Sequence, residues 1–193
     1  MPNSPKDDMT ASASGPAQAL LVPRWGGTGA SDWYPALQAA LPGRVSICDL
    51  DRPDAPTIEG CVAALARQAE PSSASILIGH SVGCQVVMRY LAASQRRFTH
   101  AVLVAAWLEI DKPWPTIEPW LTTPLRFEPI RANVDNIHVI LSTNDPFTAD
   151  YHKTRSDFEQ KLGATVSVVE GGKHFNQAEE PAVLAHLQGL LSA

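Results

Sequence analysis

Residues 74–83 of the chain read ASILIGHSVG, an apolar run that leads into Gly79-His80-Ser81-Val82-Gly83. The last five residues match the pattern G-x-S-x-G. The apolar run predicts a strand that ends at Gly79, and the apolar spacing after Val82 predicts a helix. A serine in a sharp turn between a strand and a helix is the setting of a nucleophile elbow. The stretch therefore predicts a reactive serine at the carboxyl end of a buried strand.

Short apolar runs alternate with amphipathic stretches on both sides of this turn. Strands are expected at 19–23, 45–49, 74–79, 101–105, 137–141 and 166–169. Helices are expected at 32–41, 58–69, 82–94, 156–162 and 182–191, with Ser31 and Thr57 as N-caps of the first two. Five of the six strands are nearly continuous apolar runs, which is typical of strands covered on both faces. The order predicts an α/β protein with about six mostly parallel strands flanked by helices on both faces.

Composition limits the domain organisation and the kind of partner. The chain has 193 residues, and 45% of them are hydrophobic, which suits one domain at 18–193 after a flexible tail at 1–17. The net charge of −5 and the lack of a basic run argue against a nucleic-acid partner. No apolar run is long enough for a membrane helix, so no membrane partner is expected. Three cysteines and a tail unlike a secretion signal favour the cytoplasm.

A serine hydroxyl needs a general base to become a nucleophile. His174 follows the sixth expected strand directly, in a glycine-rich loop, and is the predicted base. His152 is a weaker alternative near a strand end. Because active sites of such sheets lie at the carboxyl ends of the strands, Ser81 and His174 are expected to meet there.

A third group must orient the imidazole and stabilise its charged form. Asp145 follows the fifth expected strand directly and is the predicted orienting carboxylate, with Asp150 and Glu179 as alternatives. The chain order Ser81, Asp145, His174 is that of the α/β-hydrolases. The sequence therefore predicts an α/β-hydrolase fold in a single domain.

An oxyanion hole needs two backbone N–H groups aimed at the developing charge. Val82 follows the nucleophile and is expected to supply one of them. The loop after the first strand is expected to supply the other, from Trp25 or, as the second choice, from Arg24.

Residues 107–129 interrupt the alternation of strands and helices with five prolines and three tryptophans. Such a density of proline excludes a long helix. The segment is either a packed surface connection or a short insert near the active site. In the second case its aromatic side chains and one from the Asp145 loop line the substrate pocket: Trp107, Trp114, Trp120 and Phe147.

The motifs together resemble a known family. The residues that carry the resemblance are Gly79-His80-Ser81-Val82-Gly83, Met88-Arg89-Tyr90, Asn144-Asp145-Pro146-Phe147 and His174-Phe175. The chain is similar through these to the small serine hydrolases of the retinoblastoma-binding-protein-9 type and to the bacterial YdeN proteins. The resemblance implies a minimal α/β-hydrolase sheet without a large lid and a triad of Ser81, Asp145 and His174. The chain departs from the family's usual pattern at Trp25 and at Lys173.

The predicted activity is hydrolysis of a small carboxylic ester through an acyl-enzyme intermediate, with no metal or organic cofactor. A thioesterase, an amidase or a peptidase would use the same mechanism. A protein-binding module that retains a triad-like site is the alternative from another class. The sequence leaves open whether the chain binds a protein partner or forms a homodimer.

Overall fold

One parallel sheet organises the protein, which is described by a computed structural model covering residues 18–192 of the chain. The six strands lie in the order β2-β1-β3-β4-β5-β6, and every neighbouring pair is parallel. Their bounds are β1 Ala19–Val22, β2 Val45–Ile47, β3 Ile76–His80, β4 Phe98–Val104, β5 Val134–Ser142 and β6 Thr165–Val169. The expected fold class is therefore confirmed. The predicted tail at 1–17 lies outside the described residues.

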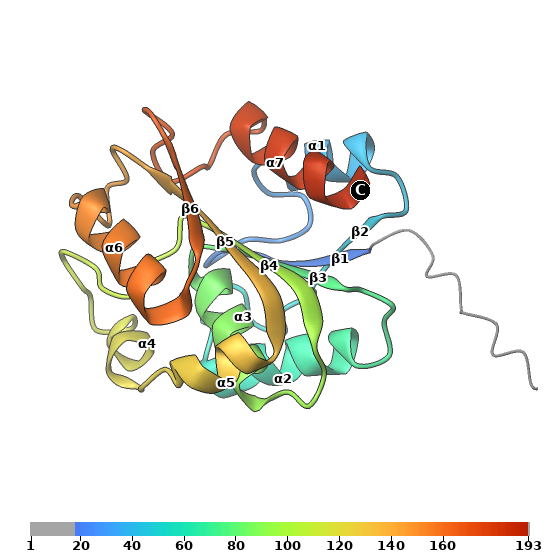
Figure 1. Ribbon diagram of the computed structural model, residues 1–193, viewed down its shortest axis with the longest axis horizontal. Helices are drawn as coiled ribbons and strands as arrows, with labels where there is room; N and C mark the ends of the chain where they lie inside the picture. The colour runs from blue at the N-terminus through green and yellow to red at the C-terminus, as the bar shows by residue number, and fades with distance from the viewer. Residues whose placement is uncertain (1–17, 193) are drawn as a thin grey trace, which may run out of the picture.

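Helices cover both faces of the sheet (Figure 1). The bounds are α1 Tyr34–Ala40, α2 Ile58–Ala69, α3 Val82–Ala93, α4 Glu118–Thr122, α5 Phe127–Ala132, α6 Tyr151–Leu162 and α7 Pro181–Ser192. Helices α1 and α7 pack on one face, and α2, α3, α5 and α6 pack on the other. No helix within residues 18–192 is both long and apolar enough to cross a membrane.

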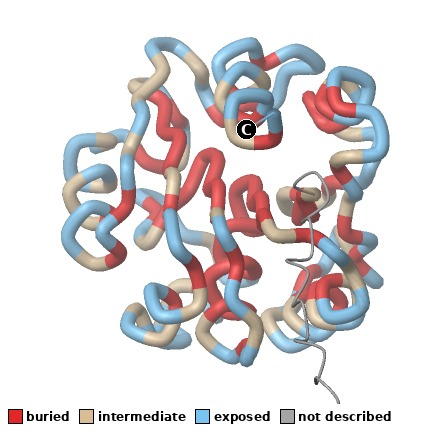
Figure 2. Tube along the Cα trace, turned by 45° about the vertical axis from the view of Figure 1, so that its right-hand side comes forward, coloured by how far each residue is buried: buried red, intermediate tan, exposed pale blue. Residues whose placement is uncertain are grey.

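The hydrophobic core is divided by the sheet into two clusters. Because side chains alternate along a strand, Leu21 and Ile78 join the cluster under α1 and α7, whereas Leu20 and Leu77 join the cluster under α2 and α3. The inner strands β1, β3, β4 and β5 are buried along most of their length, whereas β2 and β6 at the two edges of the sheet are more exposed (Figure 2). This rigid double-sided core holds the strand ends at which the predicted site residues lie.

One of the two expected helix caps is absent from the structure, and the other is confirmed. Asp32 has φ 52°, in the left-handed region, so the first helix begins two residues later than expected and Ser31 does not cap it. The side chain of Thr57 caps α2 by accepting a hydrogen bond from Gly60 N–H. Residues 107–129 contain no long helix, only α4 and the start of α5.

Candidate active site

The turn at Ser81 has the geometry of a nucleophile elbow. Ser81 links β3 to α3 with φ 55° and ψ −117°, a strained conformation for a residue with a side chain. A Cβ atom at position 83 would lie 2.2 Å from the carbonyl oxygen of Val22, and one at position 79 would lie 2.7 Å from the backbone of Cys84. Both positions therefore require glycine, because the backbone of α3 packs directly against β1 and β3.

The structure brings the three predicted catalytic side chains together. His174 Nε2 lies 2.8 Å from Ser81 Oγ, and His174 Nδ1 lies 2.7 Å from Asp145 Oδ2. A carboxylate only accepts, so Nδ1 carries the proton and Nε2 is free to accept from the serine hydroxyl. All three residues are buried, and they come from the loops after β3, β5 and β6. This arrangement can transfer the hydroxyl proton to the imidazole.

Hydrogen bonds between two loops hold the carboxylate and the imidazole in place. Asp145 Oδ1 accepts from Phe147 N–H at 2.9 Å, which fixes the carboxylate within its own turn. Asn144 Oδ1 accepts from Lys173 N–H at 2.8 Å, and Thr143 Oγ1 accepts from Gly171 N–H at 3.1 Å. Asn144 and Thr143 were not among the predicted site residues, although their place beside Asp145 was a usable signal.

The structure places the alternative candidates for the base and for the orienting carboxylate away from these contacts. Asp150 caps α6 by accepting a hydrogen bond from Lys153 N–H. His152 is exposed, and its ring packs against Tyr151. Glu179 is exposed, whereas Asp145 is buried at the imidazole.

The two expected oxyanion donors are compatible with the structure. Arg24 N–H donates to the hydroxyl of Tyr34 at 3.1 Å, so the second choice is already engaged. Among residues 18–192, the N–H groups of Val82 and Trp25 have no acceptor. Both residues line the small pocket around Ser81, and Val82 begins α3, whose N-terminus favours negative charge.

His80 connects the nucleophile elbow to the loop after β6 that carries His174, here called the histidine loop. The sequence analysis did not find this role. Its side chain is completely buried, and Nε2 lies 2.9 Å from the carbonyl oxygen of His174. Nδ1 lies 2.8 Å from the hydroxyl of Tyr34 in α1. Burial lowers the pKa of His80 to about 3. The only signal in the sequence was a histidine beside the nucleophile.

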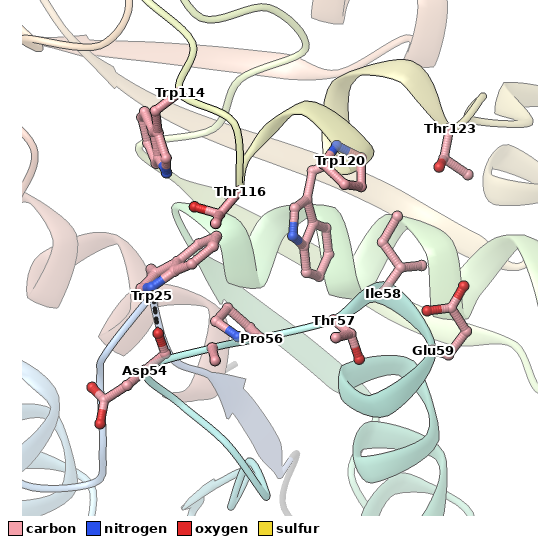
Figure 3. A pocket seen from close by; sticks show the side chains of 12 residues that line it. Trp25, Asp54, Pro56, Thr57, Ile58, Glu59, Trp114, Thr116, Trp120 and Thr123 are labelled. Atoms are coloured by element: carbon pink, nitrogen blue, oxygen red, sulfur yellow. Dashed lines mark hydrogen bonds between the residues drawn. The ribbon is translucent and has the colours of Figure 1, made fainter.

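Two pockets open at this edge of the sheet. The catalytic pocket, of about 160 Å³, is lined by Ser81 and His174 and also by Trp107 and Phe147. The aromatic pocket, of about 710 Å³, is lined by residues that include Trp25, Trp114 and Trp120 (Figure 3). Trp25 and Trp114 line both pockets, and their rings meet edge to face with centroids 6.2 Å apart. The four predicted pocket residues are thus divided between two adjoining pockets.

The Pro- and Trp-rich segment is attached to α3, the helix that follows Ser81. Gln85 donates a hydrogen bond to the carbonyl of Trp107 at 2.7 Å. Arg89 donates to the carbonyls of Trp120 and Thr123 at 2.9 and 2.8 Å. Both side chains are buried. Helix α3 therefore positions both Ser81 and the aromatic segment.

The chain matches one protein-family model and resembles several solved structures. A family model described as serine hydrolase matches residues 19–190. The ydeN gene product of B. subtilis has a similar structure, with a TM-score of 0.78 and 20% identity over 92% of this chain and all of that one. A YdeN-like hydrolase from Pectobacterium atrosepticum has a TM-score of 0.70 and 17% identity over 92% of this chain and 91% of that one.

A more distant structure comes from work on carboxylesterases of Nitrososphaera gargenis. It has a TM-score of 0.67 and 13% identity over 93% of this chain and 91% of that one. No curated protein sequence matches the chain significantly. At these identities the structural matches establish the fold.

Proposed function

This chain belongs to the serine hydrolase family, and on that premise we propose that it hydrolyses small carboxylic esters through an acyl-enzyme on Ser81. The observation that carries the proposal is the unbroken line of hydrogen bonds from Asp145 through His174 to Ser81, at 2.7 and 2.8 Å. A protein-binding module has no need for such a buried line. The geometry therefore favours the enzyme over the binding alternative.

The steps of the proposed reaction follow from this line. His174 Nε2 takes the hydroxyl proton as Ser81 Oγ attacks the ester carbonyl, and Asp145 stabilises the imidazolium. The tetrahedral oxyanion accepts hydrogen bonds from Val82 N–H and Trp25 N–H. His174 then protonates the departing alcohol. A water molecule then attacks the acyl carbonyl as it gives a proton to His174, and His174 returns that proton to Ser81 Oγ as the bond to the acyl group breaks and the acid leaves.

The two pockets suggest how the ester is oriented. The leaving oxygen must face His174, which lines the catalytic pocket and not the aromatic pocket. The acyl group then points away from His174, toward the wall formed by Trp25 and Trp114. The catalytic pocket accommodates a short acyl group, and any longer acyl group must extend past that wall into the aromatic pocket. Thioesters and amides could enter in the same orientation and remain alternative substrates.

A covalent probe together with a matched pair of serine variants tests the proposal. A fluorophosphonate should label the wild-type protein at Ser81, and short-chain p-nitrophenyl esters should be hydrolysed. Ser81→Ala should abolish labelling and reduce kcat by about 10⁴-fold or more, because the nucleophile is removed. Ser94→Ala, at a buried serine that ends α3 on the side opposite Ser81, is the control and should keep full activity.

The outcomes separate the alternatives. A folded wild-type protein that neither reacts with the probe nor hydrolyses any ester would favour the binding module. Equal turnover by Ser81→Ala would assign the activity to another site. The same series of p-nitrophenyl esters, extended from acetate to octanoate, measures how far the acyl group can extend.

Location in the cytoplasm also remains a proposal. It rests on the three cysteines, all of which are buried and unpaired. Unpaired thiols suit a reducing compartment. Fractionation of cells that produce the tagged protein would test it.

A further inference from the structure

A chain of four hydrogen-bonding groups runs behind the predicted catalytic residues. It begins at Arg24 N–H in the loop after β1, which donates to Tyr34 Oη at 3.1 Å. Tyr34 Oη lies 2.8 Å from His80 Nδ1, and His80 Nε2 lies 2.9 Å from the carbonyl oxygen of His174. These hydrogen bonds thus join the loop after β1, helix α1, the nucleophile elbow and the histidine loop.

Chemistry allows only one direction for these hydrogen bonds. The carbonyl of His174 can only accept, so His80 Nε2 carries a proton. His80 is neutral in its buried position, since burial is the main cause that lowers its pKa to about 3. Nδ1 must therefore accept, and the Tyr34 hydroxyl donates to it. The oxygen of Tyr34 is then left to accept from Arg24 N–H.

The charged groups nearby do not change this assignment. Asp32 lies 3.9 Å from His80 Nδ1, but its carboxylate is held by Arg24 in two contacts of 2.6 and 3.1 Å. The Arg24 guanidinium and the imidazole of His174 both disfavour a positive charge on His80. Glu180 is also buried on this side of the site, and its side chain accepts from Gln177 N–H. His80 is therefore a neutral link with one proton and one defined tautomer.

The histidine loop needs this support because its backbone is strained. Lys173 and Phe175, on either side of His174, have φ values of 50° and 53°. Residues other than glycine seldom adopt this left-handed region, and they keep it only where the surrounding structure holds them. Asn144 holds Lys173 N–H, whereas His80 holds the carbonyl of His174 itself.

We propose that Tyr34 and His80 are positioning residues, which hold the carbonyl of His174 so that its imidazole stays between Asp145 and Ser81. They act through His174 and do not touch the substrate. This inference rests on the proposed function, because it assigns the two residues a role in the alignment of the general base. A base displaced by about 1 Å loses roughly 10²-fold in rate.

Tyr34→Phe is the first test because it removes a single oxygen. The phenyl ring keeps the edge-to-face contacts of Tyr34 with Trp33 and His80. We expect kcat for p-nitrophenyl butyrate and the rate of fluorophosphonate labelling to fall about 10- to 100-fold, with little change in KM. The matched control is Tyr90→Phe, which removes the hydroxyl of another buried tyrosine, bonded to Glu70 at 2.9 Å. That control should change thermal stability and leave kcat unchanged.

A second pair of variants tests His80 directly. The side-chain amide of His80→Gln can still donate to the carbonyl of His174, whereas His80→Leu cannot. We expect kcat to decrease in the order wild type, His80→Gln, His80→Leu. Rescue by glutamine separates a positioning role from a loss of packing, because glutamine fills the site less well than the imidazole yet restores the donor.

The tautomer of His80 can be read without any substrate. In ¹⁵N–¹H spectra of the full chain, His80 should remain the neutral Nε2–H form from pH 5 to 8. A protonated His80 or an Nδ1–H form in that range would overturn the inference. So would unchanged kcat in folded Tyr34→Phe and His80→Leu. A wild-type protein that the probe does not label at Ser81 contradicts the proposed function instead, and the spectra still report on the tautomer.

Discussion

His80 and the trio of His100, His138 and His186 lie on the same side of the sheet, which α1 and α7 cover (Figure 1). His80 is at the carboxyl end of β3, and its two ring nitrogens face a carbonyl oxygen and a tyrosine hydroxyl at 2.9 and 2.8 Å. In the trio, His100 Nδ1 faces His138 Nε2 at 3.1 Å. Among the described residues, the buried Nε2 atom of His186 has no partner.

The difference between the two groups lies in their partners. At the carboxyl ends of the strands, the loops and the first residue of α1 bring oxygen atoms of defined hydrogen-bonding type to His80 and to His174. In the trio, the rings mainly contact one another, with centroids 5.1 and 5.2 Å apart. His80 and His174 are therefore each held in one orientation by oxygen partners, whereas the rings of the trio mainly pack against one another.

The largest expected effect comes from exchanging His174, beside His80 at the carboxyl ends of the strands, for glutamine and comparing it with the same exchange in the trio. His174→Gln removes the general base and should lower kcat for p-nitrophenyl butyrate by about 10⁴-fold. His138→Gln should leave kcat within about twofold of wild type, because the trio contacts none of the proposed catalytic residues. Comparable losses in both variants would contradict the distinction between the groups.

The trio should make the protein less stable in acid. Burial, followed by the proximity of His186 and His100, lowers the pKa of His138 from its ordinary 6.5 to about 4. Burial also lowers the pKa values of His100 and His186. Between pH 6.5 and 4 the unfolded chain therefore binds more protons than the folded protein, so the free energy of unfolding should fall as the pH decreases.

Urea unfolding of wild type and His138→Gln at pH 7, 6 and 5 measures this effect. The variant should lose stability less steeply, by up to about one proton in the pH slope. His80 contributes a slope of the same sign in both proteins, so the difference reports on His138. Identical slopes would show that His138 has no lowered pKa in the folded state.

The smallest expected effect concerns the unpartnered nitrogen of the trio. His186→Phe removes the buried Nε2 and retains a ring against His138, so it should raise the free energy of unfolding by about 1 kcal/mol. Gln188→Phe, at an exposed position of the same helix, is the control and should change it by about 0.5 kcal/mol or less. A loss of stability in His186→Phe would indicate that Nε2 has a partner in solution.

The positions of the six strands could be predicted because they depend on local pattern. A short and nearly continuous apolar run is typical of a strand buried on both faces. The strand ends do not follow from the local pattern, because the hydrogen bonds at a strand end depend on where the neighbouring strand lies. Residues Phe98 and Val134, which the apolar runs did not include, pair with each other in the register of β4 and β5. These strands therefore start earlier than the sequence pattern indicates.

By itself, the sequence determined which side chains reach one edge of the sheet. Ser81, Asp145 and His174 each follow a strand, and the carboxyl ends of parallel strands share an edge. Only the tertiary structure decided what holds them there. The partners of His80 are 46 and 94 residues away along the chain, and they meet it only after α1 and the histidine loop have packed on the sheet. A hydrogen bond forms only when its two atoms lie about 3 Å apart in space. The spacing of two residues along the chain does not predict such a contact.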